Sequence, residues 1–189
     1  MAYVKEIKDY LTGLTEVLRK LDVAQLNTFL TLLDTAREEG RQIFIFGNGG
    51  SGANASHITG DLVKGASYGK EKRFKVLCLN DNDAGMLAYA NDVSYDDVFV
   101  EQLKNFLNPG DVVVGISGSG NSVNILKAID YANEKGAITV GFCGYPGGKL
   151  ESRTKHNVHA NIHDMQFAED VHLIVGHIAM KILSGGVCY

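Results

Sequence analysis

The sequence lacks the features that several classes of protein require. Its 189 residues carry 18 Lys and Arg against 22 Asp and Glu, a net charge of −4, so no basic surplus indicates a nucleic-acid partner. No apolar run approaches the ~20 residues of a membrane-spanning helix. The N-terminal stretch "MAYVKEIKDYLTGL" alternates charged and apolar residues, unlike a signal peptide. We therefore expect contact with neither nucleic acid nor membrane.

Cysteine is also scarce. Cys78, Cys143 and Cys188 are odd in number and lack the spacing of metal-binding cysteines. This pattern disfavours a disulfide framework and predicts reduced thiols in a cytoplasmic protein. Cys78 and Cys143 lie in apolar runs, where we expect them to pack in the core.

The chain contains no repeat, linker or low-complexity tract, and its length suits one domain. Apolar residues at steps of three and four over residues 3–21 predict an amphipathic helix. Asp22 is a candidate N-cap of a second helix that ends at Gly40. We assign residues 1–40 to an N-terminal helical extension, which either forms an oligomer interface or covers a face of the remaining domain, residues 41–189.

From residue 41 onward the pattern changes to short apolar runs separated by helix-like segments. The runs "QIFIFG", "FKVLCL", "DVVVGIS" and "AITVGFCG", with "NVHANI" as a weaker fifth, are typical of strands buried on both faces. The helix-like segments between and after them span residues 53–63, 97–106, 122–134 and 168–183. This alternation predicts an α/β fold, a doubly wound five-stranded parallel sheet flanked by helices.

The loop after the first predicted strand, "GNGGSGANASH", contains the G-x-G-x-x-G spacing of dinucleotide-binding proteins in Gly47, Gly49 and Gly52. That spacing alone is a weak signal. A dinucleotide site also needs an acidic residue about 20 positions further on, at the tip of the second strand. Here that strand ends at residues 79–81, and Asp81 is 34 residues past Gly47. A dinucleotide is therefore disfavoured.

The loop after the third strand, "SGSGNSVN", offers the hydroxyls of Ser117, Ser119 and Ser122 just before a helix. Backbone N–H groups at a helix N-terminus, together with serine hydroxyls, can enclose a phosphate monoester. The alternative is a flexible loop whose serines cap the helix. Both loops follow strands whose carboxyl ends meet at one edge of a parallel sheet. Together they predict a sugar-phosphate pocket.

The two loops "FGNGGSGANASH" and "GISGSGNSVNILKAI" resemble the sugar isomerase (SIS) domain family. The helical extension, "ANDVSYDDVF" and "EDVHLIVGHI" are similar to its phosphoheptose (sedoheptulose 7-phosphate) isomerase branch. The resemblance implies a SIS fold and an enzyme that interconverts ketose and aldose phosphates through an enediol, from sedoheptulose 7-phosphate to glycero-manno-heptose 7-phosphate. It also implies zinc or another divalent metal, and a homotetramer with active sites at subunit interfaces.

The resemblance further implies roles for individual residues. The substrate-binding set is Asn48, Gly49, Ser51, Asp92, Ser117, Gly118, Ser119 and Ser122. The metal ligands are His57, Asp61, Glu169 and His177, and the last three of these are also the catalytic set. Asp61 departs from the family glutamate, and Glu169 departs from a frequent glutamine.

The spacing of the metal-competent residues leaves their arrangement open. His57 and Asp61 are i and i+4, about 6 Å apart along a helix, which suits either two ligands of one metal or a helix-surface hydrogen bond. Glu169 and His177 are eight residues apart, about 12 Å along a helix, so they reach one metal only if Glu169 precedes the helix or the two come from different subunits. His172, on another face, is expected to be buried or at an interface.

An aspartate at position 61 is about 1.5 Å shorter than a glutamate. Three outcomes follow: the backbone shifts to compensate, Glu169 supplies the carboxylate, or the protein binds sugar phosphates without isomerising them. The rival to an isomerase is therefore a non-catalytic phosphosugar-binding or protein-interaction module. A dehydrogenase ranks third because of the poor acidic-residue spacing.

Overall fold

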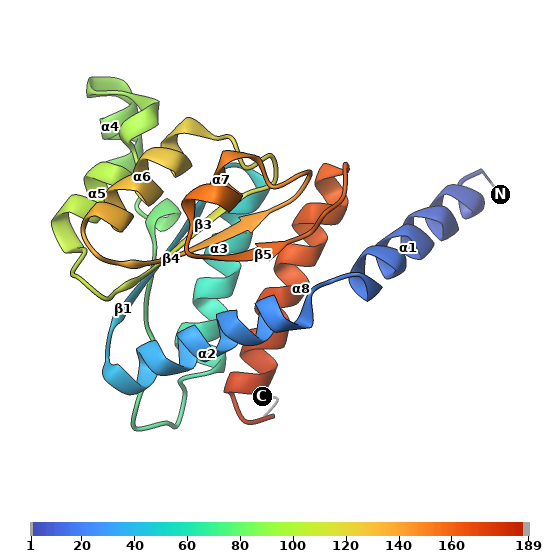
Figure 1. Cartoon of the computed structure of the whole chain (residues 1–189), viewed down its shortest axis with the longest axis horizontal. Coiled ribbons are helices and arrows are strands. Elements are labelled where there is room, and N and C mark those ends of the chain that lie inside the picture. Colours follow the sequence, from blue (N-terminus) through green and yellow to red (C-terminus); the bar gives the residue numbers. More distant parts are fainter. Residues whose placement is uncertain (1, 187–189) are drawn as a thin grey trace.

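The computed structural model describes residues 2–186 and contains one five-stranded sheet in which every pairing is parallel (Figure 1). The strand order is β2-β1-β3-β4-β5. The strands are β1 (Gln42–Gly47), β2 (Lys75–Cys78), β3 (Val112–Ser117), β4 (Ile138–Cys143) and β5 (His156–His159). All five predicted strands, including the weak fifth, are confirmed.

The α-helices are α1 (Val4–Arg19), α2 (Val23–Glu39), α3 (Gly50–Gly60), α4 (Asp83–Asp92), α5 (Val100–Phe106), α6 (Val123–Glu134), α7 (Gly148–Arg153) and α8 (Met165–Leu183). A π-helical turn, η1 (Asp61–Gly65), continues α3, and η2 (Leu79–Asp81) and η3 (Tyr95–Asp97) are 3₁₀ turns. The sequence pattern missed α4 and α7. No residue of α4 is buried and α7 has only six residues, so neither has a periodic apolar face.

The strands divide the core into two layers because successive side chains of a strand point to opposite faces. Ile43 and Ile45 of β1 pack with residues of α2, α3 and α8. Phe44 and Phe46 of the same strand pack with residues of α5, α6 and α7. The sheet is thus covered on both faces, as the apolar runs predicted.

The N-terminal extension behaves as two different parts. The Asp22 carboxylate caps α2 by accepting from the backbone N–H of Ala24, and α2 ends at Gly40 in the left-handed region, with φ 68°. Helix α2 buries Phe29 and Leu33 in the core, so it covers a sheet face.

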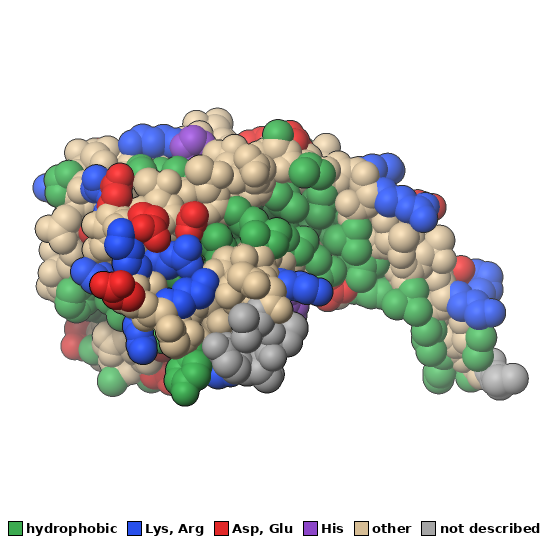
Figure 2. Space-filling model, turned by 90° about the horizontal axis from the view of Figure 1, so that it is seen from below, with side chains coloured by type: hydrophobic (Ala, Val, Ile, Leu, Met, Phe, Trp, Pro, Cys, Tyr) green, Lys and Arg blue, Asp and Glu red, His purple; other side chains and the backbone are tan. Residues whose placement is uncertain are grey.

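Helix α1, in contrast, projects from the body and buries only Val17 (Figure 1). Tyr3, Ile7 and Leu11 are 73%, 57% and 58% exposed. Hydrophobic side chains line this helix and the hollow between it and the body (Figure 2). Further along α1, Tyr10 contacts the Phe167 ring of α8 and Leu14 packs against the core, so only the exposed N-terminal part of the apolar face leaves the oligomer-interface alternative. The boundary at residue 40 stays a prediction.

The strand order locates the ligand site. From β1 the chain turns outward to β2, and from β3 it turns the other way to β4. The loops after β1 and β3 therefore diverge and leave a crevice at the carboxyl edge of the sheet. Both polar loops singled out in the sequence begin at this crevice.

Two further expectations concern thiols and membranes. Cys78 and Cys143 are buried and unpaired, and burial raises the pKa of their thiols to about 11 and about 12, so both stay protonated near neutral pH. Cys188 lies outside the described residues. Within residues 2–186, no helix combines the length and apolar character needed to cross a bilayer.

Candidate functional site

A pocket of about 280 Å³ opens between the loops after β1 and β3. It is smaller than the roughly 300–1,000 Å³ of drug-sized ligand sites, which suits one sugar phosphate better than a dinucleotide. Among the described residues that line the pocket, Glu169 is the only charged one. The lining comprises Asn48, Gly49, Gly50, Ser51, Ile116, Ser117, Gly118, Ser119, Ser122, Met165 and Glu169. The structure thus brings together every predicted substrate-binding residue except Asp92.

The serines of the second loop face the pocket instead of capping the following helix. Ser122 is the N-cap residue of α6, but its side chain makes no capping hydrogen bond. Its hydroxyl lies 3.1 Å from the Ser117 hydroxyl. Ser119 Oγ accepts the backbone N–H of Asn121. Hydroxyls at the start of a helix, with no lysine or arginine in the lining, can donate to a bound phosphate.

An asparagine that the sequence did not single out holds the first loop. The Asn80 side chain accepts the Gly47 N–H at 3.1 Å and donates to the Gly47 carbonyl at 2.8 Å, so it extends the sheet by one residue. It follows β2, close to where a dinucleotide-binding protein would place its acidic residue. The tip of β2 therefore supports the loop.

A second network that the sequence did not reveal joins the two loops. The side-chain amides of Asn48 and Asn124 donate to each other, both at 2.9 Å, and Asn124 is buried. The Tyr95 hydroxyl donates to the same Asn48 oxygen at 2.8 Å. Polar residues of this kind carry no periodic signal, and only the fold places the three side chains together.

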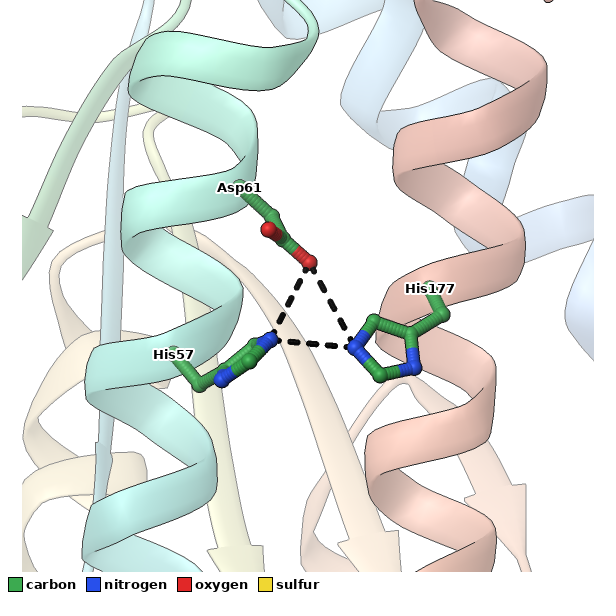
Figure 3. A group of neighbouring side chains, drawn as sticks. All are labelled: His57, Asp61 and His177. Carbon is green, nitrogen blue, oxygen red and sulfur yellow. Dashed lines mark hydrogen bonds and ion pairs between the residues drawn. The ribbon is translucent and has the colours of Figure 1, made fainter. Parts of the chain in front are cut away.

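His57, Asp61 and His177 form a cluster on the facing sides of α3, η1 and α8 (Figure 3). The Nε2 atoms of the two histidines are 3.0 Å apart. Asp61 Oδ2 lies 3.5 Å from His57 Nε2 and 3.9 Å from His177 Nε2. Within the described residues this is the one group of three or more His, Cys, Asp or Glu side chains whose ligand atoms converge.

The geometry of this triad fits a divalent metal. Tetrahedral ligands with bonds of 2.0–2.1 Å lie about 3.4 Å from one another, close to the three separations observed. Asp61 Oδ2 is buried without a hydrogen-bond partner, although it points at both imidazoles. A buried carboxylate oxygen without a donor is costly, and a bound cation would satisfy it. The set of two imidazoles and one carboxylate is typical of zinc sites that keep a free position.

Close packing of two parallel helices produces this convergence. Residues 50, 58 and 65 of the α3–η1 stretch lie against residues 169, 176 and 180 of α8, in the same order. A β-carbon added to Gly176 would lie 2.4 Å from Cγ1 of Ile58. Gly176 precedes His177 and Ile58 follows His57 in the sequence. Glycine at position 176 therefore sets the distance between the two helices next to both histidines.

Two predicted site residues lie elsewhere. The Glu169 carboxylate does not join the triad. A β-carbon built on Gly50 would lie 2.4 Å from both oxygens of this carboxylate. Glu169 therefore lies over the N-terminus of α3, in the wall of the pocket. Asp92 ends α4, is exposed, and accepts from the Asn91 amide at 2.7 Å, away from the pocket lining. Within one chain, Glu169 as a fourth metal ligand and Asp92 as a sugar contact are not realised, and both stay predictions.

Comparison with known proteins identifies the family. A model of the SIS domain matches residues 2–144. This chain belongs to the SIS domain family. Phosphoheptose isomerase from Aquifex aeolicus is 32% identical over 158 residues, 83% of this chain and 82% of that protein. Phosphoheptose isomerase from Paramagnetospirillum magneticum is 37% identical over 144 residues, 73% of this chain and 71% of that protein.

The fold has a close counterpart among solved structures. Phosphoheptose isomerase from Neisseria gonorrhoeae superposes with a TM-score of 0.87, covering 96% of this SIS-family chain and 98% of its own, at 22% identity. The likeness confirms the predicted fold, including the helices that precede the sheet.

His172 lies on α8 between Glu169 and His177 but faces the core. It is fully buried, and its Nε2–H donates to the Cys143 carbonyl at 3.2 Å. Burial lowers the pKa of its imidazole to about 4. The expectation that this histidine is buried is confirmed.

Replacement of Gly176 by alanine tests the role of helix packing. The new β-carbon would collide with Ile58, so we expect a loss of about 1–3 kcal/mol in unfolding free energy and a wider gap between His57 and His177. Zinc affinity, measured by calorimetric titration, should fall with it.

Gly60→Ala is the matched control, because a β-carbon there meets no atom within 4 Å. It should leave zinc affinity unchanged and stabilise the helix by up to about 1 kcal/mol. Equal zinc affinity in Gly176→Ala and wild type would contradict the assigned role of the glycine.

The buried imidazole of His172 predicts a pH dependence of stability. Its pKa falls from 6.5 in the unfolded chain to about 4 when folded, so between these values only the unfolded state binds the proton. The contribution of neutral His172 to folding stability is therefore fully present above pH 6.5 and is lost as the pH falls towards 4. Between pH 7 and pH 5 this amounts to about 2 kcal/mol.

Urea unfolding at both pH values measures the effect. Between pH 7 and pH 5, the unfolding free energy of His172→Gln should fall by about 2 kcal/mol less than that of wild type. His163→Gln, the same change at an exposed histidine, should keep the wild-type dependence. The prediction is wrong if the His172 variant also keeps it.

Proposed function

We propose that this protein is an aldose–ketose isomerase that interconverts sedoheptulose 7-phosphate and glycero-manno-heptose 7-phosphate. The observation that carries the proposal is a pocket of the size of a sugar phosphate and a metal-competent triad on the same pair of helices, α3 and α8. Relatives called phosphoheptose isomerase, at 32% and 37% identity over most of the chain, support it.

The pocket binds the phosphate of the substrate. The N–H groups at the start of α6 and the hydroxyls of Ser51, Ser117, Ser119 and Ser122 act as donors. Because the lining contains no lysine or arginine, recognition depends on directed hydrogen bonds, and the sugar extends away from the two loops.

The isomerisation moves two protons. A carboxylate removes a proton from C1 of the ketose while an acid protonates the oxygen at C2, which gives an enediol. The carboxylate then returns the proton to C2 as the C1 hydroxyl loses its own, which leaves the aldehyde. Asp61 and His177 are the proposed acid–base pair, and Glu169 is the second available carboxylate. His57, Asp61 and His177 would hold a divalent metal such as zinc, which would supply Lewis-acid stabilisation of negative charge on the substrate oxygens.

The active site is proposed to be shared between subunits of a homotetramer. Glu169 lines the pocket, whereas His177 lies eight residues further along α8, about 12 Å away along the helix axis. No member of the triad lines the pocket, yet both histidines are about half exposed, with side chains 49% and 53% accessible. A second copy would bring its triad to this pocket, and the apolar face of α1 supplies an interface.

The unpaired thiols of Cys78 and Cys143 suit a reducing compartment, and we propose that the enzyme is cytoplasmic. A second candidate function is a non-catalytic sugar-phosphate-binding module. The aspartate at position 61, about 1.5 Å shorter than the glutamate of the family, favours it.

The deciding experiment follows the aldose-phosphate product formed from sedoheptulose 7-phosphate, with added zinc and after chelation. We expect zinc-dependent turnover, at least about 100-fold lower in Asp61→Asn because the base is lost. Binding of the sugar phosphate, measured as a rise in melting temperature, should persist in that variant.

Asp34→Asn serves as control, since the half-exposed Asp34 carboxylate pairs with Arg37 within α2, and the variant should retain full turnover. Full turnover in Asp61→Asn would remove Asp61 from the mechanism. Wild-type protein that is stabilised by the sugar phosphate but turns nothing over would favour the binding module.

A further inference from the structure

We propose that Tyr95 is a positioning residue of the phosphate pocket, which acts through Asn48 without touching the substrate. This inference rests on the proposed function, because it assigns the pocket to a sugar phosphate. Tyr95 is not part of the pocket lining and is 53% exposed, yet its hydroxyl makes a directed hydrogen bond to a residue of the lining.

The hydrogen-bond capacity of Asn48 explains why the hydroxyl matters. Asn48 Oδ1 has two lone pairs, which accept from the Tyr95 hydroxyl at 2.8 Å and from the Asn124 amide at 2.9 Å. Asn48 Nδ2 donates back to Asn124 Oδ1 at 2.9 Å. The Asn48 oxygen is thus fully used, and the side chain has a single orientation consistent with all three bonds.

This network fixes the two phosphate loops relative to each other. Asn48 begins the loop after β1, and Asn124 is the second residue of α6, directly after the serine loop. Asn124 is buried, so its amide cannot exchange its partner for water at low cost. Tyr95 adds a third point of attachment from outside both loops.

Tyr95 also ties a weakly packed segment to the pocket. Helix α4, which carries Asp92, has no fully buried residue and contacts the core through the partly buried Met86, Tyr89 and Ala90. After it, Tyr95 bonds to Asn48, and Asp97 pairs with Lys127 of α6 at 2.9 Å. The Tyr95 hydroxyl therefore links the α4–η3 segment directly to the pocket lining.

Removal of the hydroxyl should weaken phosphate binding without unfolding the protein. In Tyr95→Phe the Asn48 amide keeps only its pairing with Asn124, and the loops lose one constraint. The loss of one such hydrogen bond corresponds to about a 5-fold weaker Kd. Because ground state and transition state lose the same constraint, the kinetic effect falls on KM and leaves kcat nearly unchanged.

The experiment measures the Kd of inorganic phosphate and of sedoheptulose 7-phosphate by calorimetry, together with KM, kcat and melting temperature. Tyr89→Phe is the matched control: it removes a hydroxyl from the same segment, where no hydrogen bond to the hydroxyl is found among residues 2–186. We expect about a 5-fold rise in both Kd values for Tyr95→Phe and none for Tyr89→Phe, with both melting temperatures near wild type.

A double-mutant cycle separates positioning from a general structural effect. In an Asn124→Ser background the amide pair is gone, so Tyr95→Phe should change Kd less than about 2-fold further. Wild-type affinity in Tyr95→Phe would overturn the inference. An equal change in Kd on Tyr95→Phe in the wild-type and Asn124→Ser backgrounds would overturn it as well. If Kd shifts as expected but wild type shows no turnover, this inference stands and the proposed isomerase fails; wild type that binds neither probe would overturn both.

Discussion

The contact between Gly176 and Ile58 sets the distance between helices α3 and α8, and both halves of the candidate site depend on that distance. At one end of the helix pair, the Glu169 carboxylate lies over Gly50 in the pocket wall. At the other end, the imidazoles of His57 and His177 come within 3.0 Å, with the Asp61 carboxylate beside them. A side chain larger than hydrogen at position 176 does not fit this packing.

Parallel packing also keeps the two halves apart. A rise of 1.5 Å per residue places Glu169, in the pocket wall, about two helical turns from His177 of the triad. Assembly of copies of the chain, with the triad of one facing the pocket of another, would explain both the exposed triad and the exposed apolar residues Tyr3, Ile7 and Leu11 of α1. On this account, the site is proposed to be complete only in the oligomer.

Much of the fold and part of the site could be predicted from the sequence. Apolar runs located the five strands, and glycines and serines at the ends of two of them located the pocket. The i, i+4 spacing paired His57 with Asp61, but only the family resemblance joined His177 to them. Asn80, Asn124 and Tyr95 escaped prediction because their roles arise from strand order and loop contacts. The placements of Glu169 and Asp92 could not be predicted, since they depend on helix register and on α4, which has no buried face.

The central claim, that pocket and triad work together across two copies of the chain, is tested by mixing two inactive variants. Ser117→Ala/Ser122→Ala disables the pocket and His57→Ala disables the triad. After subunit exchange at equal amounts, half the pairs are mixed, and each mixed pair regains one intact site of two. The account predicts recovery of about a quarter of wild-type sedoheptulose 7-phosphate turnover. No recovery above the two parents, in oligomers shown to contain both variants, would contradict it.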